Sequence, residues 1–139
     1  MRILMIFILS MLAVPCYAEL GIAIVANHDG DLGSLTRKQV VDIYMGRTTV
    51  LSSGTFPLPV DYQGNTELRE RFYRLMTGKT LAQVNAYWAR MSFTGQSNPA
   101  RTLSDQKAML RAVGKNQDAL GYVDKDEAGT AVKTILIIE

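Results

Sequence analysis

The chain has 139 residues, with 15 Lys and Arg against 13 Asp and Glu, and a formal net charge of +2. This length suits one domain, and an apolar content of 47% is enough to form a core without disulfide bonds. The nearly balanced charge argues against a dedicated nucleic-acid-binding protein, which carries a large basic excess. One Cys and one His cannot supply the four ligands of a Cys/His zinc site, and they argue against a Cys/His nucleophile.

The first eighteen residues have the pattern of a secretory signal peptide. Arg2 precedes an apolar run over residues 3–14, which only Ser10 interrupts, and the segment ends at Ala18. The run is shorter than the ~20 apolar residues that a membrane span requires. We therefore expect cleavage after Ala18, one domain over residues 19–139, and export to a bacterial periplasm. A first core strand or an anchor helix is the alternative interpretation.

The segment after the expected cleavage site predicts a strand, a helix and a second strand. Residues 20–26 form a continuous apolar run, which suits a strand buried on both faces in a parallel sheet. Thr36 and Gln39 have the spacing of a capping box at a helix start, and Gly46 can end that helix in the left-handed conformation. Residues 57–62 predict a short strand whose two prolines fit its start or an edge position.

The rest of the chain continues the alternation of helices and strands. Apolar spacing and capping residues predict helices over residues 66–76, 80–91 and 104–114. Residues 92–102 are expected to form a loop, and residues 119–123 and 131–138 are expected to be strands. This order indicates an α/β fold in which helices flank a mostly parallel or mixed sheet.

The candidate binding site is Gly64-Asn65-Thr66 with Arg69, at the junction of a predicted strand and helix. Ligands of open α/β sheets bind outside the carboxyl ends of strands, and a helix N-terminus offers unpaired N–H groups to an oxyanion. Thr66 adds a hydroxyl, and Gly64 lets a ligand approach the backbone. Arg69 is expected one turn along on the same side, flanking the core without being buried, where it can clamp a phosphate or carboxylate. The alternative is an ordinary helix cap with a solvent-exposed Arg.

The basic residues near this segment have a second interpretation. Arg69, Arg71 and Arg74 alternate with Glu67 and Glu70, which favours a solvated helix face over a basic patch.

His28, Asp29 and Asp31 form the one cluster that resembles a metal or acid/base site. Asp residues in a glycine-containing loop commonly serve turns, and the chain has no second His. Motifs for a nucleophile elbow or a phosphate-loop Lys are missing from the sequence. We therefore expect no catalytic residues, no metal and no cofactor. An envelope hydrolase that uses His28 or Asp29 is the competing hypothesis.

Three segments, in the same order, resemble the substrate-binding proteins of phosphate ABC transporters. Residues 35–46 are similar to the family's Leu-Thr helix, which ends in an aromatic residue or Ile and then Gly. Residues 60–72 correspond to its phosphate loop and the helix that follows, and residues 119–123 are similar to its Gly-Ala-Ile-Gly-Tyr-Val strand. The resemblance extends from Leu20 to about Asp124. It implies a lobe of the type 2 periplasmic-binding-protein fold.

Full members of that family have two such lobes that close over phosphate, whereas residues 19–139 make only one. The family's Ser-Gly-Thr phosphate loop is replaced by Gly64-Asn65-Thr66-Glu67, and Glu67 would repel a dianion unless it points away. The helix that contains Trp88 and the segment over residues 93–99 are more similar to a short, single-lobe branch of phosphate-transporter-like proteins.

The resemblance implies phosphate or a similar small anion as the ligand of Gly64, Asn65, Thr66 and Arg69. An envelope or transporter partner, or a second copy of the chain, would complete the cleft, and nucleic acid is not expected as a partner. The alternative function is an accessory or interaction module of the cell envelope that keeps the fold without binding a ligand.

Overall fold

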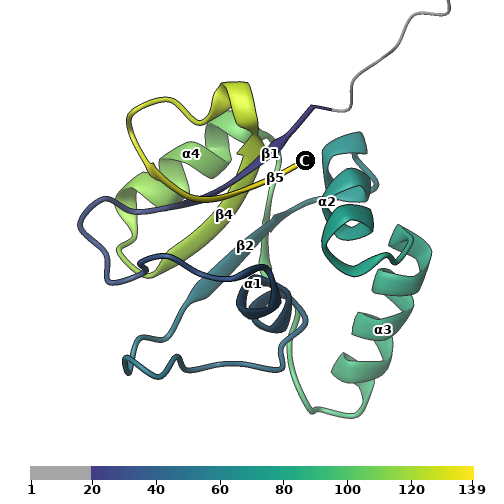
Figure 1. Ribbon diagram of the computed structural model, residues 1–139. Coiled ribbons are helices and arrows are strands. Elements are labelled where there is room, and N and C mark those ends of the chain that lie inside the picture. The colour runs from purple at the N-terminus through teal and green to yellow at the C-terminus, as the bar shows by residue number, and fades with distance from the viewer. Residues whose placement is uncertain (1–19) are drawn as a thin grey trace, which may run out of the picture.

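The structure is a computed structural model that describes residues 20–139 (Figure 1). The strands in this range are β1 (Ile22–Ala26), β2 (Leu58–Tyr62), β3 (Arg101–Leu103), β4 (Ala119–Asp124) and β5 (Lys133–Ile138). The helices are α1 (Arg37–Tyr44), α2 (Glu67–Thr77), α3 (Leu81–Phe93), α4 (Gln106–Lys115) and the short 3-10 helix η1 (Lys125–Glu127). The expected signal peptide, residues 1–18, lies outside the described range. No helix within that range has the length and apolar content needed to cross a membrane.

The strands form one mixed sheet in the order β3-β2-β4-β1-β5. β2 pairs in parallel with β3 and β4, whereas β1 runs antiparallel to both β4 and β5. Every residue of β1 is buried, as the apolar run predicted. The expectation of a parallel neighbourhood for β1 is wrong, because burial on both faces depends on the layers around a strand and not on its direction. The α/β class with a mixed sheet is confirmed.

Pro57 directly precedes β2 and Pro59 is its second residue, in a strand that lies inside the sheet. Pro59 faces Leu120 of β4, and β3 pairs with β2 only from Val60 onward. The strand-start alternative is therefore confirmed and the edge alternative is wrong. A proline there is tolerated because the ladder with β3 begins after it.

Two local features between α3 and α4 differ from the sequence prediction. β3 overlaps the end of the segment expected to be a loop, residues 92–102, and its three residues are mostly exposed. Such a short strand has no hydrophobic pattern of its own, because it is defined by pairing with β2. The cap of α4 is Asp105 and not Ser104, since the Asp105 side chain accepts a 2.8 Å hydrogen bond from the Ala108 N–H.

α1 and α3 begin with the same capping box. Thr36 and Thr80 accept hydrogen bonds from the backbone N–H groups of Gln39 and Gln83, at 3.2 and 3.3 Å. The two glutamine side chains accept in return from the N–H groups of the threonines, at 2.8 and 3.0 Å. Each box satisfies two backbone donors that the first helical turn leaves unpaired, and the box predicted at Thr36 is confirmed.

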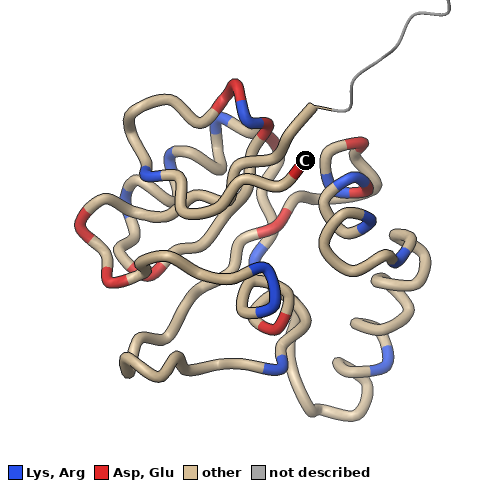
Figure 2. Tube along the Cα trace, viewed as in Figure 1, with Lys and Arg blue, Asp and Glu red and all other residues tan. Residues whose placement is uncertain are grey.

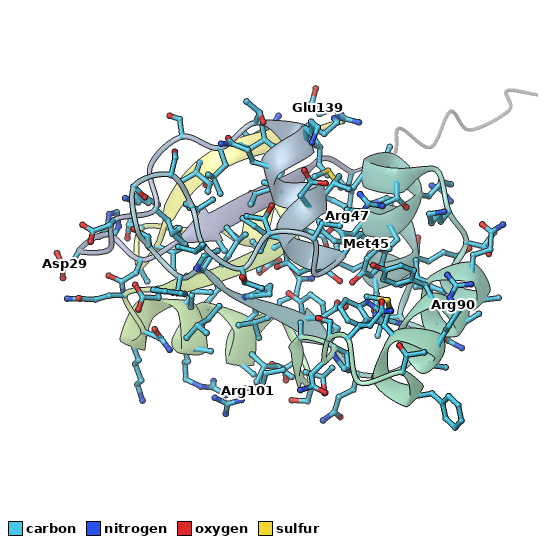
Figure 3. All side chains as sticks on the ribbon, turned by 90° about the horizontal axis from the view of Figure 1, so that it is seen from below. Asp29, Met45, Arg47, Arg90, Arg101 and Glu139 are labelled. Carbon is cyan, nitrogen blue, oxygen red and sulfur yellow. The ribbon has the colours of Figure 1, made fainter. Side chains whose placement is uncertain are left out.

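α1 and α4 cover opposite faces of the sheet, while α2 and α3 lie together at one side of it (Figures 1 and 3). α4 packs so closely on β4 that Gly121 has no space for a side chain. A Cβ atom there would lie 2.6 Å from Met109 Sδ and 2.9 Å from Val113 Cγ2.

A group of aromatic rings fills the core between α1, α2 and the sheet. The Phe72 ring of α2 stacks on the Tyr122 ring of β4, with 3.8 Å between centroids. Tyr44 and Tyr73 meet Phe72 edge to face, at 4.9 and 5.0 Å. The Tyr62 hydroxyl donates a 2.6 Å hydrogen bond to the carbonyl oxygen of Tyr122. Four tyrosine hydroxyls are thus held in the interior, where a negative charge would be strongly disfavoured.

We predict that the protein loses stability as the pH rises above about 10. Burial, and next the charge of Asp61, raises the pKa of Tyr44, Tyr73 and Tyr122 well above the usual value. The unfolded state then releases protons that the native state keeps, so the free energy of unfolding falls by about 1.4 kcal/mol per pH unit for each such tyrosine. Denaturant titrations from about pH 8 to about pH 11 measure this slope.

Tyr73→Phe serves as the control, because it should make the alkaline slope shallower by about one tyrosine. The absorbance of tyrosinate measures directly the pH at which the tyrosines of the folded protein ionise. If most tyrosines ionised near pH 10 in a protein that stayed folded, the account of the core would be wrong.

Candidate functional site

Asp61, at the end of β2, is a buried carboxylate with four hydrogen-bond donors around it. Its residue surface is only 4% exposed. Oδ2 accepts from Arg69 Nε at 3.2 Å and from the Tyr73 hydroxyl at 2.7 Å. Oδ1 accepts from the Tyr122 hydroxyl and from the Tyr62 backbone N–H. The charge is therefore both paired and hydrogen-bonded, which is the condition for a stable carboxylate in a protein interior.

Arg69 is buried, with 9% of its surface exposed, so the prediction that it flanks the core without burial is wrong. Its Nη1 donates to the Gly64 carbonyl oxygen at 3.2 Å and to Asn85 Oδ1 at 3.1 Å. Burial is the largest single influence on the pKa of Arg69 and acts to lower it, but the charge and hydrogen bond of Asp61, together with Tyr73 and Tyr122, outweigh burial, and the pKa is raised. Helical periodicity could not show this, because the carboxylate that draws Arg69 inward belongs to a neighbouring strand. The alternative of a solvent-exposed Arg is wrong for the same reason.

Arg71 is also buried, against the expectation of a solvated face for the arginines of α2. Its Nη2 donates to Asp124 Oδ1, and Asp124 Oδ2 accepts from Gln106 Nε2 at 2.9 Å. Glu67 and Glu70 are exposed. α2 thus turns two of its arginines toward carboxylates on β2 and β4, and its acidic residues toward solvent. Figure 2 shows the resulting alternation of basic and acidic positions along this helix.

The predicted binding segment lies at the solvent-exposed start of α2. Gly64 has a φ of 71°, the left-handed conformation that glycine adopts at little cost, and a Cβ there would meet no atom within 4 Å. The Thr66 side chain caps the helix by accepting from the Arg69 N–H at 3.2 Å. Asn65 Oδ1 lies 3.5 Å from Asn85 Nδ2 of α3. The structure therefore brings Gly64, Asn65 and Thr66 together at the surface, with Arg69 beneath them.

The N-terminus of α2 differs from those of α1 and α3 because it lacks the second half of a capping box. Arg69 stands where the other two helices have Gln, and its side chain turns to Asp61 and the loop carbonyl. Within residues 20–139, the backbone N–H groups of residues 64–68 donate no hydrogen bond to the protein. Open donors and the partial positive charge of a helix start both favour an anion, while Glu67 in the first turn opposes it.

The loop that contains His28, Asp29 and Asp31 does not assemble a metal-type cluster. His28 Nε2 lies 2.8 Å from the Thr130 carbonyl oxygen, and the Asp29 N–H donates to Asn27 Oδ1 at 2.8 Å. Among the residues that the structure describes, no group of three or more His, Cys, Asp or Glu side chains could hold a metal ion.

Two residues of the candidate site were missed by the sequence analysis. Asp61 carried a usable signal, since a charged residue inside a short apolar strand requires a buried partner. Asn85 carried none, because a polar residue on the outer side of a predicted helix is ordinary. Its contacts with Arg69 and Asn65 depend on how α3 packs beside α2.

Comparison with solved structures shows which known proteins share this fold. A crystal structure of an ABC-type phosphate transport receptor from Vibrio cholerae superposes with a TM-score of 0.65 and 23% identity. The superposition covers 84% of this chain and 45% of the receptor. This chain shares its fold with part of that phosphate-transport receptor. The resemblance inferred from the sequence is thereby confirmed at the level of fold, for a part of such a receptor.

Two further solved structures match the same fold. A protein from Clostridium perfringens, described as a phosphate ABC transporter substrate-binding protein with bound phosphate, has a TM-score of 0.66 and 18% identity, covering 84% of this chain and 44% of that one. A protein from Planctomyces limnophilus DSM 3776, described as a possible phosphate binding protein, has a TM-score of 0.62 and 16% identity, covering 84% and 40%.

The chain spans less than half the length of these three proteins. All three are described as transport receptors or binding proteins, which agrees with the expectation of a non-enzymatic function. No protein-family model matches the sequence, and no curated protein matches it either.

We predict that Arg69→Lys lowers the free energy of unfolding by about 1–2 kcal/mol. A lysine cannot reach Asp61, the Gly64 carbonyl oxygen and Asn85 at the same time. Arg90→Lys, at an exposed position of α3, should stay within about 0.5 kcal/mol of the unchanged protein. Urea unfolding measures both, and equal losses in the two variants would contradict a special role for Arg69.

Proposed function

We propose that this protein is a periplasmic solute-binding protein of the phosphate-receptor type, which binds phosphate or a similar small oxyanion at the start of α2. The observation that carries the proposal is the row of unpaired N–H groups over residues 64–68, just beyond the carboxyl end of β2. This is the position at which open α/β sheets bind ligands, and a helix start there suits an anion. The phosphate bound in the Clostridium perfringens structure supports the same class of ligand.

In this proposal the main chain supplies most of the contacts. Gly64, Asn65 and Thr66 donate hydrogen bonds from their backbone N–H groups. The Thr66 hydroxyl oxygen already accepts from the Arg69 N–H, so its hydrogen is free to point outward to the anion.

Arg69 has one nitrogen left for such a ligand. Its Nε and Nη1 are bonded to Asp61, Gly64 and Asn85, whereas Nη2 has no hydrogen bond in the described part of the chain and is not buried. Arg69 therefore holds the loop in place with two nitrogens and presents the third toward solvent.

The charge balance predicts weak binding. The buried pair of Arg69 and Asp61 is neutral overall, and Glu67 adds a negative charge in the first turn of the helix. A single lobe also leaves half of the ligand in water. We therefore expect a Kd near the millimolar range, about 4 kcal/mol of binding free energy, unless a partner or a second copy covers the site.

The first test is a phosphate titration followed by calorimetry and by backbone amide NMR. We expect chemical-shift changes centred on residues 64–68 and a weak binding isotherm. Thr66→Ala should weaken binding about three- to tenfold through loss of the hydroxyl donor. Thr80→Ala removes the same cap from α3 and should leave phosphate affinity unchanged. Absence of heat, melting shift and amide shifts at millimolar phosphate would contradict the proposal.

The second test concerns Glu67. Because its carboxylate opposes an anion at the helix start, Glu67→Gln should strengthen phosphate binding about two- to fivefold at low salt. Glu127→Gln, an exposed acidic residue of η1, is the matched control and should not change it. Equal effects of the two substitutions would indicate only a general change in net charge.

The alternative function, an envelope accessory module that keeps the fold without a ligand, has one supporting observation. Val50, Phe56 and Leu58 are apolar side chains that are 46%, 64% and 48% exposed. This alternative predicts that residues 64–68 do not respond to phosphate and that cross-linking in the periplasm captures a protein partner.

A further inference from the structure

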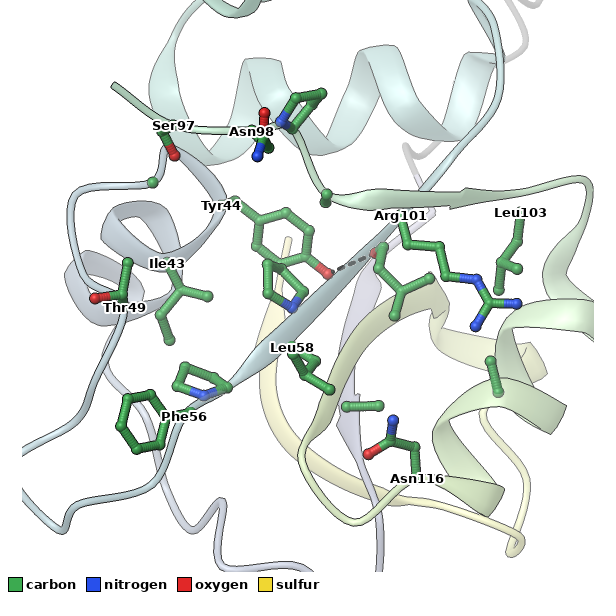
Figure 4. A pocket seen from close by; sticks show the side chains of 18 of the residues that line it. Ile43, Tyr44, Thr49, Phe56, Leu58, Ser97, Asn98, Arg101, Leu103 and Asn116 are labelled. Carbon is green, nitrogen blue, oxygen red and sulfur yellow. Dashed lines mark hydrogen bonds between the residues drawn. The ribbon is translucent and has the colours of Figure 1, made fainter. Parts of the chain in front are cut away.

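A pocket of about 800 Å³ lies at the start of β2, at the opposite end of this strand from the proposed oxyanion site (Figure 4). β2 and β3 pair only from Val60 and Arg101 onward. Before that point β2 and the segment that leads into β3, residues 97–100, both line the pocket. The end of α1 and one face of α4 line it as well.

The pocket has the size and the apolar walls of a ligand site. Its volume falls within the range of roughly 300–1,000 Å³ that is typical of pockets for small molecules. Phe56 and Leu58 line it with side chains that are 64% and 48% exposed, and Trp88 contributes from α3. Ala108 and Ala112 line it from α4, and their small side chains leave the space beside the helix open.

All charged residues that line the pocket are basic. They are Arg101 of β3 and Arg111 and Lys115 of α4, and no Asp or Glu lines it. Arg111 and Lys115 are four residues apart on one helix face, where like charges are mildly destabilising. In the described part of the chain, none of the three has an ion pair or a hydrogen bond from its side chain.

Three arginines elsewhere in the described residues differ in this respect. Arg47, Arg69 and Arg71 each pair with a carboxylate of the chain. Figure 4 shows the guanidinium group of Arg101 between β3 and α4, on the side of the pocket. Three cations without an ion pair around an apolar cavity suit a ligand that brings its own negative charge.

We propose that this pocket binds an amphiphilic anion, with an apolar chain or ring system and one carboxylate, sulfonate or phosphate group. The apolar part lies against Phe56, Leu58 and the two alanines of α4. The anionic group meets Arg101 and Arg111. A concave cavity of this size favours a small molecule over the flat surface of a protein partner. The proposal is independent of phosphate binding at α2.

Fluorescence titration with anilinonaphthalene sulfonate tests the proposal, because this probe combines an aromatic body with one negative charge. N-phenylnaphthylamine has the same aromatic body without the charge and is the matched neutral probe. We expect the anionic probe to bind at least about fivefold more tightly than the neutral one. Arg101→Gln and Arg111→Gln should each weaken the anionic probe about two- to fivefold and leave the neutral probe unchanged.

Two further variants separate the pocket from the rest of the surface. Ala112→Phe fills the cavity and should weaken both probes, with thermal unfolding confirming that the variant is folded. Arg90→Gln changes an exposed arginine on α3, away from Arg101 and α4, and should affect neither probe (Figure 3). Millimolar inorganic phosphate should not displace the probe, because it lacks the apolar part.

The proposal is overturned if both probes bind equally well. It is also overturned if Arg90→Gln weakens the anionic probe as much as Arg101→Gln does, or if Ala112→Phe changes neither probe. Displacement by inorganic phosphate at the same concentration that shifts the amides of residues 64–68 would overturn it as well, since the probe would then occupy the α2 site.

Discussion

The buried carboxylate of Asp61 joins the elements on which the candidate site depends. It receives a guanidinium and a hydroxyl from α2, a hydroxyl from β4 and a backbone N–H from its own strand. Without it, Arg69 would be a buried cation with no opposing charge, and Tyr73 and Tyr122 would lose their acceptor. Such unpaired groups cost several kcal/mol, so α2 is held in one position relative to the sheet. The aromatic stack of Phe72 on Tyr122 lies beside this carboxylate and depends on the same placement.

The same interaction determines what the start of α2 can do. Arg69 has only donors, so it cannot accept from the Thr66 N–H and close a capping box as Gln39 and Gln83 do, and the N–H groups of residues 64–68 stay open while its side chain pairs with Asp61. The pairing with Asp61 also neutralises most of the positive charge that Arg69 would otherwise offer to a ligand. The start of α2 therefore combines open backbone donors with little net charge, and this combination is the basis of our proposal that it binds a small oxyanion weakly.

Local chemistry made part of this structure predictable from the sequence. The capping box at Thr36, the left-handed Gly46 and the buried run of β1 depend on residues close together in the chain. The direction of β1, the existence of β3 and the burial of Arg69 depend on pairing between distant segments. No local sequence pattern can therefore predict them. The position of the binding segment at the strand–helix junction was predictable. The role of Arg69 was not, because Asp61 and Asn85 define it from other elements.

The central claim is that Asp61 and Arg69 act as one buried unit, and a double-mutant cycle tests it most directly. The free energies of unfolding would be measured for the unchanged protein, Asp61→Asn, Arg69→Met and the double variant. Each single substitution should cost about 3 kcal/mol, because it leaves the other charge buried and unpaired. The double variant should lose clearly less than the sum, with a coupling of about 2 kcal/mol. Losses that add to within about 0.5 kcal/mol would show that the two charges do not depend on each other, and would contradict the account.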